Sequence, residues 1–141
     1  MTDKMVDRIT RSFESQSMMR TLGAKIHKIE KGKVIIEAPI LPSTLQQQGY
    51  GHAGLTFSIG DSAAGYSALT LLPEGQEVMT AEIKINLLAP ADGELLRAEG
   101  KVVKSGKRLV VVTSEINALK DGKTKLIAII QATMVPVPLK P

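Results

Sequence analysis

Short runs of β-forming apolar residues, interspersed with polar ones, occur on both sides of the middle of the chain. Two of them, "AKIHKIE" and "KVIIEAPI", are joined by the turn sequence "EKGK" and predict two β-strands between residues 24 and 40. Beyond the segment "PEGQE" the chain changes character and becomes rich in β-forming residues. This part predicts four more strands, approximately over Val78–Leu88, Gly93–Val103, Arg108–Leu119 and Lys123–Val135.

The two groups of strands are separated by a long apolar segment, Ala53–Leu72, which predicts a buried central helix. A polar, glycine-containing loop over residues 41–51 leads into it. Near the N-terminus, widely spaced apolar residues between Val6 and Met19 give a weaker helical pattern. Residues 1–20 are therefore expected to form an N-terminal helix or arm.

The order of the elements predicts an α+β fold in which an antiparallel sheet of five to six strands wraps the one strongly apolar helix. The segments "PADG", "KSGKR" and "KDGKT" are turn signals of the hairpin kind between the later strands. The central helix is rich in Gly, Ser and Ala, and glycine inside a helix costs roughly 1 kcal/mol relative to alanine. A close neighbour is therefore expected, which is a tightly curved sheet, a helix from a second subunit, or both.

Length and composition narrow the class of protein. The 141 residues suit a single domain, and 43% apolar with 23% charged residues excludes a disordered chain. There is no cysteine, which excludes disulfides, thiolate zinc sites and a cysteine nucleophile. The first twenty residues are too polar for a signal peptide, and the apolar helix contains a carboxylate and many small residues. We expect a cytoplasmic protein without a membrane partner.

The net charge of +4 and the pI near 9.4 favour anionic partners. The basic residues are scattered over predicted turns and strands, and two Phe, two Tyr and no Trp leave little to stack on bases. This pattern disfavours nucleic acid and favours a phosphorylated small molecule.

One carboxylate stands out, because from Ala38 to Pro73 there is no Lys or Arg and the only acid is Asp61. A buried, unpaired carboxylate is unfavourable, so it is either satisfied locally or used in chemistry. The nearby "GYGHAG" spells a dinucleotide-binding pattern, but the strand and βαβ unit that this pattern requires are missing. With His27 and His52 as the only histidines, we expect neither a metal nor a cofactor.

The start of the predicted helix offers a second candidate group. Free backbone N–H groups around Ala53 and Gly54, together with the helix dipole, suit an oxyanion or a carbonyl oxygen. The simpler interpretation is that His52 caps the helix. Asp61 lies eight residues after Ala53, about 12 Å along the helix axis, so one chain cannot bring both to one carbon atom. If they cooperate, each must come from a different subunit across a two-fold axis.

Two segments, "HAGLTFSIGDSAAGY" and "TAEIKINLLAPADGE", resemble the PaaI-like branch of the hotdog-fold acyl-CoA thioesterases. That family has His-Gly-Gly or His-Ala-Gly at the start of its central helix and a carboxylate nine residues after the histidine. The resemblance extends from Leu22 to Val135 within a domain of residues 1–141. It implies a hotdog fold around a helix over residues 53–72, cofactor-free hydrolysis of acyl-CoA, and a homodimer or homotetramer with shared active sites.

The resemblance also implies roles for single residues. Asp61 matches the catalytic carboxylate, which acts as nucleophile or as general base, and Ala53 matches the residue whose main-chain N–H polarises the thioester carbonyl. Gln46 stands where many members have an orienting Asn, and Thr80 where some have a hydroxyl that positions water. His52 and Gly54 are expected to contact the substrate. The family's Tyr-Leu-Arg-Pro is "LLAP" here, so no arginine stands at that position.

Three cations of the turn "KSGKR", namely Lys104, Lys107 and Arg108, are candidates for binding the phosphates of CoA. The simpler interpretation is a solvated hairpin turn. Two other functions stay open: a hotdog hydratase or dehydratase, which would use His52 together with an acid, and a non-catalytic acyl-CoA-binding domain. Asp61 disfavours the latter.

Overall fold

The computed structural model describes residues 1–140 as four helices and six strands. The helices are α1 (Asp3–Glu14), α2 (Ser17–Thr21), the 3₁₀ helix η1 (Pro42–Thr44) and α3 (Ala53–Leu69). The strands are β1 (Lys25–Glu30), β2 (Lys33–Pro39), β3 (Gln76–Leu87), β4 (Leu95–Ser105), β5 (Val110–Lys120) and β6 (Lys123–Pro138).

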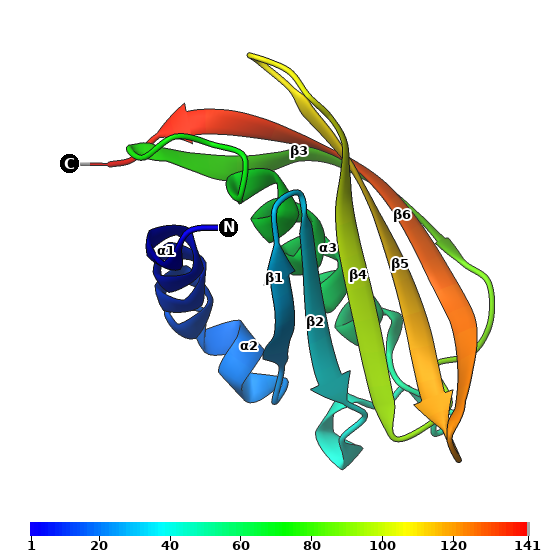
Figure 1. Cartoon of the computed structure of the whole chain (residues 1–141). Coiled ribbons are helices and arrows are strands. Elements are labelled where there is room, and N and C mark those ends of the chain that lie inside the picture. The colour runs from blue at the N-terminus through cyan, green and yellow to red at the C-terminus, as the bar shows by residue number, and fades with distance from the viewer. Residues whose placement is uncertain (141) are drawn as a thin grey trace.

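All six strands form one antiparallel sheet in the order β1-β2-β4-β5-β6-β3. The sheet curves around α3, and α1 and α2 lie to one side of this body, beside β1 (Figure 1). The predicted α+β architecture, a sheet wrapped around one central helix, is confirmed. Within the described residues, no helix is both long and apolar enough to cross a membrane.

The N-terminal segment forms two helices where the sequence predicted one weak helix. Thr2 caps α1 by accepting the N–H of Met5, and the helix buries Ile9 and Phe13 on one face. The chain leaves α1 at Ser15, and α2 then buries Met19. The apolar pattern changes phase between Phe13 and Met19, which is why a break between two short helices satisfies it better than one continuous helix.

The small residues of α3 adapt the helix to the sheet. A Cβ atom added at Gly60 would lie 2.6 Å from the side chain of Ile130, and one added at Gly100 of β4 would lie 2.2 Å from the carbonyl oxygen of Ala63. Ala64 and Ala68 are completely buried. The curved sheet therefore explains Gly60, Ala64 and Ala68, and these three positions are not available for contact with a sister helix.

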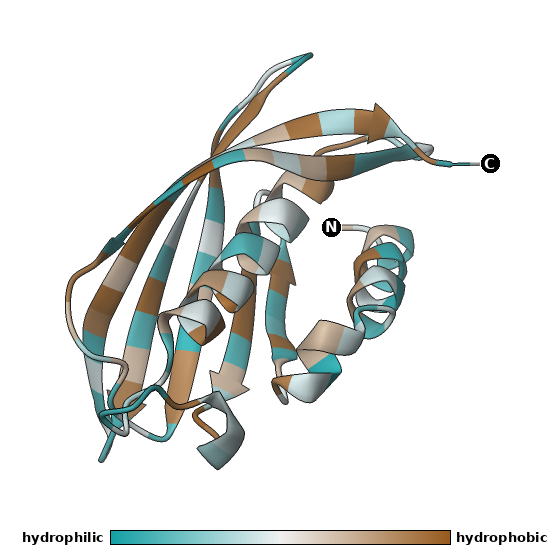
Figure 2. Ribbon diagram, turned by 180° about the vertical axis from the view of Figure 1, so that it is seen from behind, coloured by the Kyte–Doolittle hydropathy of each residue, from teal (hydrophilic) through white to brown (hydrophobic). Residues whose placement is uncertain are grey.

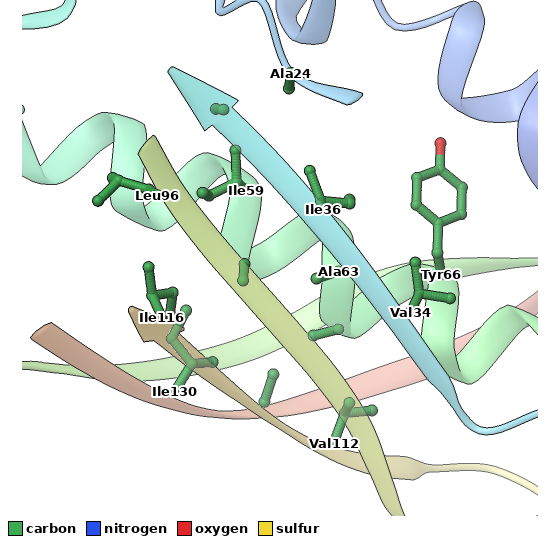
Figure 3. Packing of buried hydrophobic residues seen from close by; sticks show 14 of the residues in the cluster. Ala24, Val34, Ile36, Ile59, Ala63, Tyr66, Leu96, Val112, Ile116 and Ile130 are labelled. Carbon is green, nitrogen blue, oxygen red and sulfur yellow. The ribbon is translucent and has the colours of Figure 1, made fainter. Parts of the chain in front are cut away.

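The buried side chains of α3 interleave with those of the sheet (Figure 3). Ile59 and Ala63 of the helix face Ile36 of β2, Leu96 of β4 and Ile116 of β5, all of them fully buried. At roughly 25 cal/mol per Å² of apolar surface removed from water, this layer is the main source of the fold's stability. When the chain is coloured by hydropathy, polar segments alternate with apolar ones along the outer strands and α1 (Figure 2).

One predicted hairpin is wrong. The turns "KSGKR" and "KDGKT" do join paired neighbours, β4 to β5 and β5 to β6. The segment "PADG" instead joins β3, at one edge of the sheet, to β4, which lies between β2 and β5. Its crossing is stabilised by hydrogen bonds from Leu88 N–H to the carbonyl of Ile127 and from Gly51 N–H to the carbonyl of Ala91. A turn signal marks a change of direction but does not say which strand pairs next.

Candidate active site

The first group of candidate residues lies where α3 begins. His52 is in an extended conformation, and its ring Nδ1 accepts the N–H of Gly54 at 2.7 Å. In the neutral ring this bond places the proton on Nε2. The N–H of Gly54 is thereby occupied, whereas that of Ala53 donates to no other group of residues 1–140. Ala53 therefore supplies the free main-chain donor at this end of the helix.

A cavity of about 430 Å³, here called the helix-start cavity, opens beside this donor. Its wall combines the loop before α3, the first turn of the helix, the crossing segment after β3, and β6. The lining residues are Gln46, Gln48, Tyr50, Gly51, His52, Ala53, Thr56, Leu87, Leu88, Ala89, Pro90, Ala91 and Ile127.

Gln46 holds the loop that carries this wall. Its side-chain oxygen accepts the main-chain N–H groups of Gln48 and Tyr50, and its main-chain N–H donates to the carbonyl of Tyr50 at 2.8 Å. Further along, His52 N–H donates to the carbonyl of Thr44 at 2.8 Å. The Gln46 side-chain nitrogen donates to the side-chain oxygen of Gln48 at 3.3 Å, so both ends of the amide order the loop between η1 and α3.

The second group lies farther along α3, at Asp61. The carboxylate is half-buried and accepts the Thr80 hydroxyl of β3 at 2.8 Å. Burial raises the pKa of Asp61 above its ordinary value, and the hydrogen bond from Thr80 opposes this by stabilising the charged form. The pKa stays raised on balance, so Asp61 is a stronger base than an exposed aspartate.

A β-bulge places Thr80 against the helix. The register between β3 and β6 shifts between Thr80 and Glu82, which leaves Ala81 as an extra residue. Before the bulge Val78 and Thr80 face α3, and after it Ile83 turns inward. Because side chains alternate along a strand, an unbroken register could not place both Thr80 and Ile83 on the inner face.

Asp61 opens into a cavity of its own, of about 220 Å³, here called the Asp61 cavity. It shares no lining residue with the helix-start cavity. The structure therefore brings Gln46, His52 and Ala53 together, and separately Asp61 and Thr80. The Asp61 cavity is lined by Ser12, Gln16, Asp61, Ser62, Gly65, Tyr66, Glu77, Val78 and Thr80.

The candidate phosphate-binding cations lie elsewhere. Lys104, Lys107 and Arg108 are exposed in and beside the turn between β4 and β5 and line neither cavity. In Figure 1 this hairpin projects from the end of the sheet that lies away from the start of α3.

A different set of lysines borders the helix-start cavity. Lys120, Lys123 and Lys125, around the β5–β6 turn, line a third cavity of about 630 Å³, here called the lysine cavity. It shares Tyr50 and Pro90 with the helix-start cavity, so the two adjoin. The sequence analysis used "KDGKT" only as a turn signal and assigned no role to Lys125. The cluster of lysines is visible in the sequence. Its position beside the helix start is not, because that position depends on how the segment after β3 crosses to β4.

Comparisons with known proteins identify the family of this chain. The family model of the thioesterase superfamily matches residues 48–125, which include the start of α3, Asp61 and Thr80. The chain belongs to the thioesterase superfamily. A protein from Saccharolobus solfataricus that is named as an esterase is 31% identical over 113 residues, covering 80% of this chain and 78% of the relative. A 1,4-dihydroxy-2-naphthoyl-CoA hydrolase from Listeria monocytogenes is 27% identical, covering 83% of this chain and 93% of the relative.

Solved structures of this thioesterase's relatives show the same fold. A thioesterase family protein from Silicibacter pomeroyi is 37% identical, with a TM-score of 0.94 over 96% of this chain and 99% of that one. The PaaI protein of E. coli, at 21% identity, has a TM-score of 0.84 over 95% and 94% of the two chains. The predicted hotdog fold and the resemblance to PaaI-like proteins are confirmed, and the chain is a thioester hydrolase.

Proposed function

We propose that this thioesterase hydrolyses acyl-CoA and that each active site combines residues of two subunits. Asp61 and Thr80 of one subunit supply the base, and Ala53 at the helix start of a second subunit supplies the oxyanion donor. The named activity of the Listeria monocytogenes relative, a CoA hydrolase, supports the choice of substrate. The net positive charge suits a substrate that carries several phosphate charges.

The separation of the two half-sites carries this proposal. Ala53 and Asp61 are on one straight helix about 12 Å apart, and they open into cavities without a common lining residue. A donor and a base that act on one carbonyl must both lie within hydrogen-bond reach of the reacting atoms. Two chains related by a two-fold axis satisfy this requirement, because their α3 helices then run in opposite directions.

The chemistry follows from the groups present. The Asp61 carboxylate removes a proton from a water molecule, and the hydroxide formed attacks the thioester carbonyl carbon. The carbonyl oxygen becomes an oxyanion that accepts the Ala53 N–H, with the helix dipole adding to its stabilisation. Collapse of the tetrahedral intermediate breaks the C–S bond, and the departing thiolate takes the proton from Asp61. The Thr80 hydroxyl donates to Asp61, and its oxygen is left to accept from the attacking water.

The raised pKa of Asp61 supports the role of general base, because a stronger base removes a proton from water more readily. Direct attack of the carboxylate on the thioester, through an anhydride, is the alternative route. A hydratase or dehydratase that uses His52 as its base is less well supported, since Nδ1 of that histidine is engaged by Gly54.

The first prediction tests this function with Asp61→Asn. The variant keeps a side chain that can accept the Thr80 hydrogen bond but cannot take a proton, so kcat should fall on the order of 10²- to 10⁴-fold. The measurement is release of free CoA thiol from a series of acyl-CoA substrates, with circular dichroism to confirm folding. A folded variant with near-normal turnover would show that Asp61 is not the base.

A further inference from the structure

The N-terminal helix α1 forms part of the site, although it lies outside the residues matched by the family model. Ser12 near the end of α1 and Gln16 just after it line the Asp61 cavity. The position of α1 beside the body of the fold is seen in Figure 1, and the family match begins only at residue 48. One wall of the cavity that holds the proposed base is therefore built by the N-terminal segment, which the family model does not match.

Several contacts fix this wall in place. Phe13 is buried and packs edge-on against the ring of Tyr66, with 6.1 Å between the ring centroids. The side-chain nitrogen of Gln16 donates to the Tyr66 hydroxyl at 2.7 Å, and the Ser12 hydroxyl lies 3.0 Å from the same oxygen. Arg8 donates to the carbonyls of three residues that follow α3, namely Leu72, Pro73 and Gln76.

The cavity that this wall closes is small and polar. Its volume of about 220 Å³ is below the roughly 300–1,000 Å³ of pockets that hold drug-sized ligands. Apart from Gly65, its lining residues are polar or charged except Val78 and the ring of Tyr66. An aliphatic chain placed here would exclude water from the side-chain oxygen of Gln16, which accepts from no group of residues 1–140, and leaving such an oxygen unpaired is unfavourable.

Gln16 offers a specific acceptor in this cavity. Its nitrogen is used by Tyr66, while its side-chain oxygen has no hydrogen-bond partner in the described part of the chain. Such an oxygen can accept a hydroxyl group of a bound acyl chain. A site built to bind a hydroxyl also rejects analogues that lack one, because its own polar group then stays unpaired.

We infer that α1 closes the acyl end of the site and that Gln16, supported by Ser12, determines specificity for a short acyl group that carries a hydroxyl substituent. This inference rests on the proposed function, because it takes the Asp61 cavity as the place where the acyl group lies during hydrolysis.

The experiment compares kcat/KM for 3-hydroxybutyryl-CoA with butyryl-CoA, and for 6-hydroxyhexanoyl-CoA with hexanoyl-CoA, using decanoyl-CoA as a long aliphatic probe. In at least one of the two pairs, kcat/KM of the wild-type protein should be at least tenfold higher for the hydroxylated substrate than for its unsubstituted partner. Hydrolysis of decanoyl-CoA should be poor. Gln16→Leu should reduce this preference to within about twofold and improve hydrolysis of decanoyl-CoA. Gln16→Glu keeps an acceptor oxygen and should keep the preference.

Matched controls separate recognition from folding. Gln131→Leu changes an exposed glutamine of β6, and Ser15→Ala changes an exposed serine beside Gln16; both should keep the wild-type ratios. The midpoint of urea unfolding shows whether Gln16→Leu remains folded. A wild-type preference for the unsubstituted chains that Gln16→Leu leaves unchanged would overturn the inference and leave the thioesterase proposal intact. If no acyl-CoA releases thiol at all, the proposed function itself fails.

Discussion

At the scale of single residues, the Asp61–Thr80 pair shows how the fold adjusts the pKa of the proposed base. Burial of Asp61 raises its pKa, and the Thr80 hydroxyl moderates that rise. A carboxylate with a raised pKa in the folded state favours the protonated form there, so its ionisation destabilises the fold as the pH rises through that pKa. The ionised Asp61 therefore lowers the stability of the fold. Such a loss is expected of a residue whose role is chemical and not structural.

The second prediction concerns the pH dependence that Thr80 controls. In the proposed mechanism Asp61 must be ionised, so kcat/KM should rise with pH through the Asp61 pKa. Thr80→Val removes the hydrogen bond that lowers this pKa, so the acidic limb of the profile should move to higher pH. Thr80→Ser keeps the hydroxyl and should keep the limb near its wild-type position. If the valine variant showed an unshifted limb, Thr80 would not control ionisation of the base.

At the scale of elements, the sequence predicted most of what could be read locally. The predicted strand over residues 33–40 differs from β2 by one residue, and the predicted helix over 53–72 extends three residues beyond α3. These elements follow from local patterns of apolar residues. The bulge at Ala81 and the crossing of "PADG" depend on which strands pair across the sheet, and local pattern carries no information about that pairing.

In the candidate site, too, only the features that depend on local sequence were predictable. Asp61 and Ala53 stood out as an isolated acid and a helix start, and their 12 Å separation followed from helix geometry alone. The contribution of Gln16 was not predictable, because it requires α1 to fold back onto Tyr66, about fifty residues further along the chain. The place of Lys123 beside the helix start depends in the same way on distant parts of the chain.

The third prediction compares the two hairpin turns as binding sites for the phosphates of CoA. The lysine cavity adjoins the helix-start cavity, so Lys123→Gln with Lys125→Gln should raise KM for acyl-CoA several-fold and make it less sensitive to salt. Lys120 is left unchanged because its amine forms an ion pair with Asp92 at 2.8 Å.

The matched comparison is the β4–β5 turn, where Lys104, Lys107 and Arg108 are the cations predicted from the sequence. Replacing all three by Gln removes a similar kind of surface charge from the opposite end of the sheet. A rise in KM confined to the β4–β5 variant would assign the phosphates to that turn and exclude the lysine cavity. If KM is unchanged in both variants, neither turn binds the phosphates of CoA.

At the scale of the whole molecule, β3 leaves an open edge. It is the last strand of the sheet, and its outer side pairs with no other strand among residues 1–140. Two large apolar side chains are also exposed: Met79 of β3 is 62% exposed, and Phe57 of α3 is 40% exposed. Open strand edges and exposed apolar groups favour association with another chain. These features support the proposed dimer through β3 and through the face of α3 that carries Phe57 and Asp61.

The fourth prediction is that two inactive variants restore one active site when they form a dimer. Asp61→Asn lacks the base. Ala53→Pro lacks the oxyanion donor, and proline is well tolerated at the first position of a helix. His52, the residue before it, already has φ −64° and ψ 144°, a conformation compatible with a following proline. Each variant alone should be inactive and folded.

Co-expression of the two variants with different affinity tags allows the mixed dimer to be purified by two successive affinity steps. One of its two sites then combines an intact Asp61 with an intact Ala53, while the other has neither, so the mixed dimer should recover about half of the wild-type kcat. The control mixes two differently tagged copies of Asp61→Asn and should stay inactive. If a purified mixed dimer showed no recovery, or if a monomer at high dilution kept full activity, the two half-sites would not cooperate across the interface. Asp61 would then require a different oxyanion donor within its own chain.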